Sequence, residues 1–301
     1  MLSNRTLLIL TTAVAPALWG TTYLTTTLLL PPDRPLLAAT LRALPAGLLL
    51  LALARRMPHG SWWWKSWVLG VLNIGAFFAL LFIAAYRLPG GVAAVVGGVS
   101  PLVVAVLASR VLHEKLTARV IVAGAAGVFG VSLIVLQAQS RLDAIGVLAA
   151  FGGMLSMATG IVLSKKWGQP APPLATTAWQ LIAGGLTLLI LLLVFEGLPS
   201  EPLTPTNLLG YAYLSIIGTA FAYLLWFRGI SRLPTSIPAF LGLLSPVVAI
   251  LAGWLVAGET LTPPQLAGIA IVLGAVVAAI HPFRWSRSAR RRSTRLETFA
   301  G

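Results

Sequence analysis

Ten long apolar segments, almost free of charged side chains, limit the folds that this sequence can adopt. A helix needs about 20 apolar residues to cross the hydrocarbon core of a bilayer, where no backbone group can be left unpaired. The segments are Leu7–Leu30, Leu36–Ala54, Trp67–Tyr86, Val92–Leu112, Val120–Gln137, Ala144–Ser164, Leu174–Phe195, Leu208–Phe227, Ile237–Ala257 and Gln265–Ile280. We therefore expect an all-α membrane protein with ten transmembrane helices.

The composition agrees with this interpretation and removes several other classes of protein. Of the 301 residues, 58% are hydrophobic and 9% are charged, whereas a soluble domain carries about 25% charged residues. The chain has no Cys, which excludes disulfide frameworks, cysteine zinc clusters and thiol nucleophiles. Because the connections between the segments are short, we expect a single membrane domain over residues 1–301, with a basic tail at 283–301.

The positive charges gather on one side of the expected bundle. With a cytoplasmic N-terminus, 17 of the 21 Lys and Arg residues fall in cytoplasmic connections or at the chain ends, three fall outside, and Arg42 lies within a span. Cytoplasmic connections of membrane proteins are enriched in these residues, so we predict that both termini are cytoplasmic. The net charge of +14 then needs no nucleic-acid partner, since the basic tail can bind anionic membrane lipid.

The two halves of the chain resemble one another. At a common offset of 145 residues, the recurring elements are Arg87-Leu88-Pro89 with Arg232-Leu233-Pro234, Ser100-Pro101 with Ser245-Pro246, and Glu114 with Glu259. Earlier in each half, Arg42 aligns with Gln180. Each half holds five spans, and an odd number turns one half upside down relative to the other. We predict two inverted five-helix repeats, at about residues 5–138 and 142–282.

A set of short motifs carries a family resemblance. The motifs are Trp19-Gly20-Thr21-Thr22-Tyr23, Leu41-Arg42, Leu88-Pro89, Ser100-Pro101, Glu114-Lys115-Leu116-Thr117, and the second copies Leu233-Pro234, Ser245-Pro246 and Glu259-Thr260-Leu261-Thr262. This set resembles the EamA-type branch of the drug/metabolite transporter superfamily, and within it the chain is similar to bacterial aromatic amino acid exporters. The resemblance implies a secondary transporter in the bacterial inner membrane, with a central substrate cavity at the repeat interface.

Several catalytic chemistries lack the residues that they need. No Gly-x-x-x-x-Gly-Lys-Ser/Thr loop occurs, so the chain has no phosphate-binding loop for ATP. The histidines His59, His113 and His281 fall at expected helix ends or in loops, and no Asp or Glu lies near the middle of an expected span. An enzyme or metal site within the bilayer would need such groups to converge. We expect no enzyme activity, no metal and no cofactor.

Arg42 is the sole charged residue well inside an expected span. An ionisable residue at such a depth is a functional candidate, because burying its charge in hydrocarbon is costly. A structural role is the alternative, since Arg42 lies six residues after Leu36, about 9 Å along a helix, and a long side chain can extend from there to the interface. The functional alternative is contact with a substrate carboxylate or with a gate.

Polar and aromatic residues inside the spans are the other candidates for a substrate site. Aromatic faces suit planar apolar ligands, which stack on them with an offset. With Arg42, the candidates are Trp19, Tyr23, Asn73, Phe77, Phe78, Phe82, Ser100, Ser156, Trp179, Gln180, Tyr213 and Ser245. Packing within the bundle is the alternative role for each of them.

The Ser-Pro steps of the fourth and ninth spans predict the moving parts. Pro removes one backbone donor from a helix and clashes with the preceding turn, which produces a kink. The candidate hinge residues are Gly97, Gly98 and Pro101 in one half and Gly242 and Pro246 in the other. We expect export of amino acids, mainly aromatic ones, or related metabolites by alternating access. The alternatives are export of cationic drugs or other metabolites, and a channel or scaffold.

Overall fold

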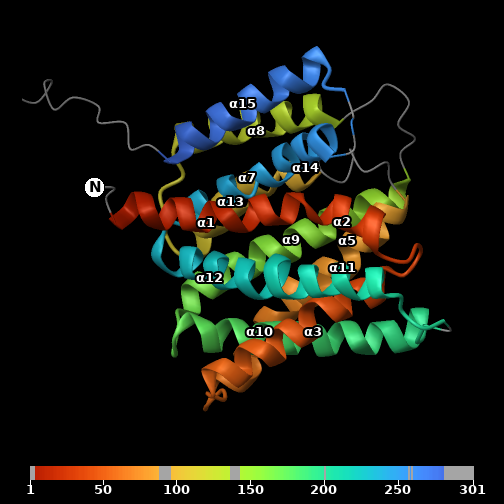
Figure 1. The fold of residues 1–301 in the computed structure, drawn as a ribbon. Coiled ribbons are helices and arrows are strands. Elements are labelled where there is room, and N and C mark those ends of the chain that lie inside the picture. The colour runs from red at the N-terminus through yellow and green to blue at the C-terminus, as the bar shows by residue number, and fades with distance from the viewer. Residues whose placement is uncertain are drawn as a thin grey trace, which may run out of the picture.

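The computed structural model describes residues 4–87, 96–135, 143–199, 201–256, 258 and 260–280, and every regular element within these ranges is a helix. Figure 1 shows that the helices form one bundle in which most of them run roughly alongside one another. Among the described residues, eight helices of 18 to 28 residues are long and apolar enough to cross a membrane. The chain is therefore a multi-pass membrane protein.

Four of the expected spans are continuous α-helices in the described part of the chain. They are α3 (Pro35–Ala54), α8 (Ala118–Val135), α9 (Ala144–Trp167) and α15 (Pro263–Ile280). Pro35 and Pro263 begin their helices at the first turn, where a missing N–H leaves no hydrogen bond unmade. The Asp143 side chain accepts a hydrogen bond from Gly146 N at 2.7 Å and so caps the N-terminus of α9.

Three other spans change from α-helix to π-helix along their length. They consist of α4 (Trp62–Gly70), η1 (Val71–Gly75) and α5 (Ala76–Arg87); α10 (Pro173–Leu191) and η2 (Leu192–Glu196); and α11 (Pro205–Ser215), η3 (Ile216–Phe221) and α12 (Ala222–Arg232). A π-helical turn interrupts the regular hydrogen-bond ladder and is frequent at functional sites. The offset of 145 residues places η1 and η3 at equivalent positions of the two halves.

Turns interrupt the remaining spans. Thr21 separates α1 (Asn4–Gly20) from α2 (Thr22–Leu29), a turn at Val99 precedes α7 (Ser100–Val111), and Gly242 and Leu243 separate α13 (Ser236–Leu241) from α14 (Leu244–Val256). The first expected span is not among the eight, and the fourth is a shorter apolar helix, Val96–Val111, in the described residues. Both Ser-Pro steps therefore follow directly on a break in their helix.

The start of the third span differs from the sequence-based prediction. The helix begins at Trp62 rather than at Trp67, because a helix with Trp and Lys side chains remains stable in the interfacial region beyond the hydrocarbon core. Lys65 supports this turn, since its Nζ lies 5.4 Å from the ring centroid of Trp62 and 5.8 Å from that of Trp64. The Leu88-Pro89 motif, Glu259 and the tail at 283–301 lie outside the described residues.

The helices are arranged around two antiparallel pairs at opposite ends of the bundle (Figure 1). At one end α8 lies beside α15, and at the other α3 lies beside α10. Between these pairs, α1 contacts α12 and α14, and α9 contacts α5 and α7. In the sequence alignment of the two halves, α1 is equivalent to α9, α5 to α12 and α7 to α14. The contacts of α1 in one half are thus the counterparts of the contacts of α9 in the other.

Glycines allow the outer pairs to approach closely. A Cβ atom on Gly268 of α15 would lie 2.6 Å from the backbone oxygen of Gly130 in α8, and one on Gly130 would lie 3.0 Å from the oxygen of Gly268. In the other pair, a Cβ on Gly185 of α10 would lie 2.9 Å from the Leu44 backbone in α3. Small residues at membrane helix crossings permit such backbone contact and the van der Waals packing that holds the helices together.

Replacing Gly268 by Val is expected to destabilise the protein by about 1–3 kcal/mol, because the new side chain forces α8 and α15 apart. Thermal unfolding of the purified protein in detergent measures the effect. Gly274→Val on the same helix is the control, since a Cβ at Gly274 meets no atom within 4 Å. Equal unfolding temperatures for the two variants would show that the crossing at Gly130 and Gly268 does not stabilise the bundle.

Candidate functional site

The Arg42 side chain lies inside the bundle and does not extend to the interface. It is 5% exposed, and its Nε donates a hydrogen bond to Thr219 Oγ1 at 3.1 Å while its Nη2 donates to Gly218 O at 3.4 Å. The guanidinium carbon also lies 4.7 Å from the ring centroid of Phe78, a cation–π contact. Among the described residues, no Asp or Glu forms an ion pair with Arg42.

The π-helical segment η3 supplies the acceptors that hold Arg42. Both Gly218 and Thr219 belong to this segment, and Gly218 O also accepts a hydrogen bond from Trp19 Nε1 at 3.1 Å. A π-turn leaves carbonyl groups outside the regular helical ladder, so they are available to side chains of neighbouring helices. Trp19 of α1 and Arg42 of α3 therefore converge on one turn of the eighth span.

Phe78, which contacts the guanidinium, belongs to a cluster of aromatic side chains. Trp19 lies with its ring centroid 5.0 Å from that of Tyr223 and 5.0 Å from that of Trp226. Phe78 lies 5.5 Å from Phe77 and 6.4 Å from Tyr223. These separations are typical of offset or edge-to-face aromatic pairs. We call Arg42, Trp19, Phe78, Tyr223 and Trp226 the arginine site.

A second polar cluster occupies the equivalent place in the other half. Asn73 in η1 donates from Nδ2 to Gln180 Oε1 at 2.9 Å and to Ser164 Oγ at 3.2 Å, and Ser156 Oγ donates to Leu72 O at 2.8 Å. Gln180 aligns with Arg42, and η1 aligns with η3. Arg42 of α3 thus reaches η3, and Gln180 of α10 reaches Asn73 in η1, but the first side chain is a cation and the second is an amide.

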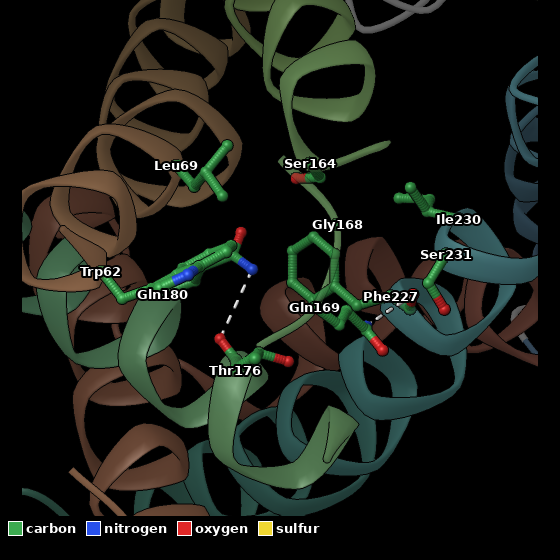
Figure 2. Close-up of a pocket in the computed structure, with 10 residues that line it drawn as sticks. All are labelled: Trp62, Leu69, Ser164, Gly168, Gln169, Thr176, Gln180, Phe227, Ile230 and Ser231. Carbon is green, nitrogen blue, oxygen red and sulfur yellow. Dashed lines mark hydrogen bonds between the residues drawn. The ribbon is translucent and has the colours of Figure 1, made fainter. Parts of the chain in front are cut away.

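A small cavity lies beside the amide cluster (Figure 2). Its volume of about 10 Å³ has room for about one water molecule. Figure 2 shows Gln180, Ser164 and Thr176 around it on one side and Gln169, Phe227 and Ser231 on the other. Gln180 donates from Nε2 to Thr176 O at 3.4 Å. The carbonyl oxygen of Asn73 is buried without a hydrogen-bond partner in the described structure.

The structure brings some of the predicted site residues together and separates others. In the arginine site, Trp19 and Arg42 donate to the same carbonyl oxygen, that of Gly218. Phe78 contacts the Arg42 guanidinium, and Phe77 lies beside Phe78. Asn73, Ser156 and Gln180 belong to the amide cluster. The side chains of Tyr23 and Phe82 lie outside the described part of the structure.

Other predicted residues lie elsewhere in the fold. Trp179 Nε1 donates to Arg56 O at 2.7 Å, at the end of α3, and Tyr213 Oη shares a 2.8 Å hydrogen bond with Thr21 Oγ1 at the break of the first span. The two serines of the Ser-Pro steps lie at the start of the helices that follow the breaks: Ser100 is the first residue of α7 and Ser245 is the second of α14. The backbone oxygen of Ser245 would lie 2.6 Å from a Cβ on Gly20, so the Ser245-Pro246 step packs against the Trp19-Gly20 motif.

The sequence analysis missed three aromatic residues of α12, of which Tyr223 and Trp226 belong to the arginine site and Phe227 lines the small cavity beside the amide cluster. Tyr223 and Trp226 are 1% exposed and Phe227 is 2% exposed. The repeat could have found two of them, because an offset of 145 residues carries Phe78 onto Tyr223 and Phe82 onto Phe227. The acceptors Gly218 and Thr219 had no such signal, since a π-turn is not visible in hydropathy.

A structural ion pair at the far end of α3 contrasts with the arginine site. Arg34 Nε lies 2.9 Å from Glu196 Oε1, and the same carboxylate accepts hydrogen bonds from Leu36 N at 2.7 Å and Leu37 N at 3.2 Å. Glu196 therefore caps the N-terminus of α3, where a negative charge is stabilising. The described residues contain no group of three His, Asp or Glu side chains that could hold a metal ion.

Comparison with known proteins identifies the family. The sequence model of the EamA-like transporter family matches residues 6–136 and again residues 144–280. Protein PecM of Dickeya dadantii is 45% identical over 265 residues, which cover 87% of this chain and 89% of that protein. A probable amino-acid metabolite efflux pump of Salmonella typhimurium is 28% identical over 71% of this chain and 75% of its own length.

The fold also has a counterpart among solved structures. One crystal structure superimposes with a TM-score of 0.81 over 92% of this chain and 99% of the other, at 21% sequence identity. This similarity supports the fold alone. The two family matches cover nearly the whole described bundle, and the relatives named above agree with them. The chain belongs to the EamA-like transporter family.

Proposed function

We propose that this chain is a secondary exporter of amino acids, mainly aromatic ones, or of related small carboxylates, working by alternating access in a bacterial inner membrane. The observation that carries the proposal is the Arg42 guanidinium, which is buried in the bundle without a carboxylate among the described residues. The name of the Salmonella relative, an amino-acid metabolite efflux pump, supports the same class of substrate.

The charge of Arg42 favours an anionic substrate group. A cation removed from water is costly unless an anion and good hydrogen bonds compensate it. Arg42 has five N–H donors, and Thr219 and Gly218 accept two hydrogen bonds from them. A substrate carboxylate can accept two parallel hydrogen bonds from a guanidinium, which are among the strongest in proteins. The same positive charge repels cationic drugs, so export of cations is less favoured.

The aromatic residues of the arginine site favour a planar apolar side chain on that substrate. Trp19 and Phe78 lie next to the Arg42 guanidinium or share its acceptor. A substrate held there by its carboxylate would place its side chain against these rings. Stacking of aromatic rings contributes about 0.5–1.5 kcal/mol beyond the burial of area, which is enough to select aromatic over small amino acids about tenfold at most.

The proposed architecture has ten crossings in two inverted five-helix repeats. The separate family matches to residues 6–136 and 144–280 support two repeats. Antiparallel contact between the equivalent helices α3 and α10 supports their inversion, because Glu196 at the end of the second meets Leu36 at the start of the first. The charge distribution supports cytoplasmic termini.

The helix breaks are the proposed hinges. Gly97, Gly98 and Pro101 flank the turn at Val99, and Gly242 and Pro246 flank the break between α13 and α14. In an inverted repeat these two breaks serve opposite sides of the membrane. Bending at one break at a time would open the central site to one side at a time.

The substrate class can be tested with purified protein in liposomes. We expect phenylalanine, tyrosine and tryptophan to be transported faster than alanine or glutamate, because only the aromatic amino acids combine a carboxylate with a stacking surface. Trans substrate should accelerate uptake, as it does for a carrier and does not for a pore. Equal rates for alanine and phenylalanine would exclude an aromatic site, and absence of trans acceleration would favour a channel.

The role of Arg42 can be separated from a structural one with Arg42→Met. Removing a buried charge that has no ion-pair partner among the described residues is expected to leave stability unchanged or higher. Phenylalanine transport should fall at least about tenfold through loss of a charge-assisted contact of roughly 1.5–3 kcal/mol. Thermal unfolding and proteoliposome uptake measure the two effects.

Arg34→Met is the matched control for Arg42→Met. Arg34 has a carboxylate partner, so its loss leaves Glu196 with the backbone donors of Leu36 and Leu37 but without its cation, and this should destabilise the protein by about 1–3 kcal/mol. The half-saturation concentration of phenylalanine should not change in this variant. A destabilised Arg42→Met that transports normally would assign Arg42 a structural role.

The orientation can be tested by thiol labelling, which is clean in a chain without Cys. A new Cys at Arg34 should react with an impermeant reagent added from the periplasmic side, and a new Cys at Lys166 should react from the cytoplasmic side. Both positions are suited to this because Lys166 is exposed and Arg34 is partly exposed. The reverse pattern would invert the proposed topology.

A further inference from the structure

Lys165 joins two helices at the end of the bundle that carries the excess of basic residues. It lies in the last turn of α9, and its Nζ donates hydrogen bonds to Ser231 O at 3.1 Å and to Leu233 O at 3.0 Å. These two carbonyls belong to the end of α12 and the residue that follows it. An ammonium has three donors, and the two carbonyls accept from two of them.

Two cavities are lined by neighbouring residues of the same two chain segments. The small cavity beside the amide cluster is lined by Ser164 and Ser231, as Figure 2 shows. An open pocket of about 590 Å³ is lined by Lys165 and Arg232, the residues that directly follow Ser164 and Ser231 in the sequence. Lys165 therefore lines the open pocket at a point where the small cavity begins one residue earlier in the chain.

The open pocket has an excess of positive charge. Among the described residues that line it, Lys115, Lys165 and Arg232 are basic and Glu114 alone carries a carboxylate. Glu114 already accepts a hydrogen bond from Thr235 N at 3.4 Å, within the segment that follows Leu233. A concave surface with net positive charge raises the local concentration of anions.

We propose that Lys165 is a binding group for the carboxylate of the substrate at the cytoplasmic entrance of the transport route. This inference rests on the proposed function. The third donor of the ammonium receives the carboxylate first, and the carboxylate then replaces the carbonyls of Ser231 and Leu233. Loss of these two hydrogen bonds releases α9 from the end of α12 and connects the open pocket to the small cavity, and through it to Gln180 and its partner Asn73.

Lys165→Gln tests the inference, because the amide keeps donors for the two carbonyls and removes the charge. In oriented proteoliposomes, we expect the half-saturation concentration of phenylalanine on the cytoplasmic side to rise at least about tenfold and that on the periplasmic side to stay within about twofold. Lys165→Arg should restore most of the affinity. Lys166→Gln, the same change at the exposed neighbour, should have no effect.

A purely structural contact would give a different result. If Lys165→Gln lowered the maximal rate from both sides and left both half-saturation concentrations unchanged, Lys165 would only join α9 and α12, and the inference would be wrong. An equal rise on both sides would also contradict it, because the proposed site serves one side.

A binding measurement keeps this inference separate from the proposed function. A reporter Cys at Thr117, on the rim of the open pocket, is modified by an anionic methanethiosulfonate, with phenylacetate as the competing carboxylate. We expect phenylacetate to slow modification in the Lys165 protein and not in Lys165→Gln. This result would support the carboxylate site even if phenylalanine were not transported. Absence of protection, or equal protection in both proteins, would overturn it.

Discussion

The hydrogen bonds from Arg42 to the η3 turn connect α3 to the span formed by α11, η3 and α12 inside the bundle. A guanidinium within a membrane bundle is stable only where acceptors are fixed around it. Here they are fixed because η3 departs from the α-helical ladder and exposes Gly218 O and Thr219 Oγ1. The close crossing of α3 with α10 at Gly47 and Gly185 and the Glu196 cap at the start of α3 set the depth and rotation of the helix that carries Arg42.

The approximate equivalence of the two halves makes the difference at this site informative. Arg42 of the second helix contacts η3, and its counterpart Gln180 contacts η1 through Asn73. Both halves place a polar side chain against a π-helical turn, but only Arg42 is charged, since Gln180 is a neutral amide. In our account the charged half holds the carboxylate of the substrate, and the neutral half offers hydrogen-bond donors and acceptors without a second cation that would repel the first.

Hydropathy predicted the all-α membrane fold, because a chain that crosses lipid needs long apolar helices. The start of the third span was predicted at Trp67, but the helix begins at Trp62. The hydropathy pattern missed this Trp-rich turn because it is helical although it lies in the interfacial region. Arg42, Trp19 and Phe78 were recognised as candidates from residue type alone. Trp179 was recognised in the same way, yet it contacts Arg56 at the end of α3. The sequence pattern shows which face of a helix a residue lies on, but not which other helix packs against that face. The π-turns and the acceptor Gly218 depend on backbone geometry that composition does not encode.

The central claim is that the Arg42 guanidinium holds the carboxylate of the substrate. The most direct measurement is an experimental structure of the purified protein with bound phenylalanine. Our account predicts the carboxylate oxygens within about 3 Å of the Arg42 guanidinium nitrogens, a normal distance for a charge-assisted hydrogen bond, with the phenyl ring against Trp19 or Phe78. A bound phenylalanine whose carboxylate contacts Asn73 and Gln180 while Arg42 keeps only its contacts with η3 would contradict it.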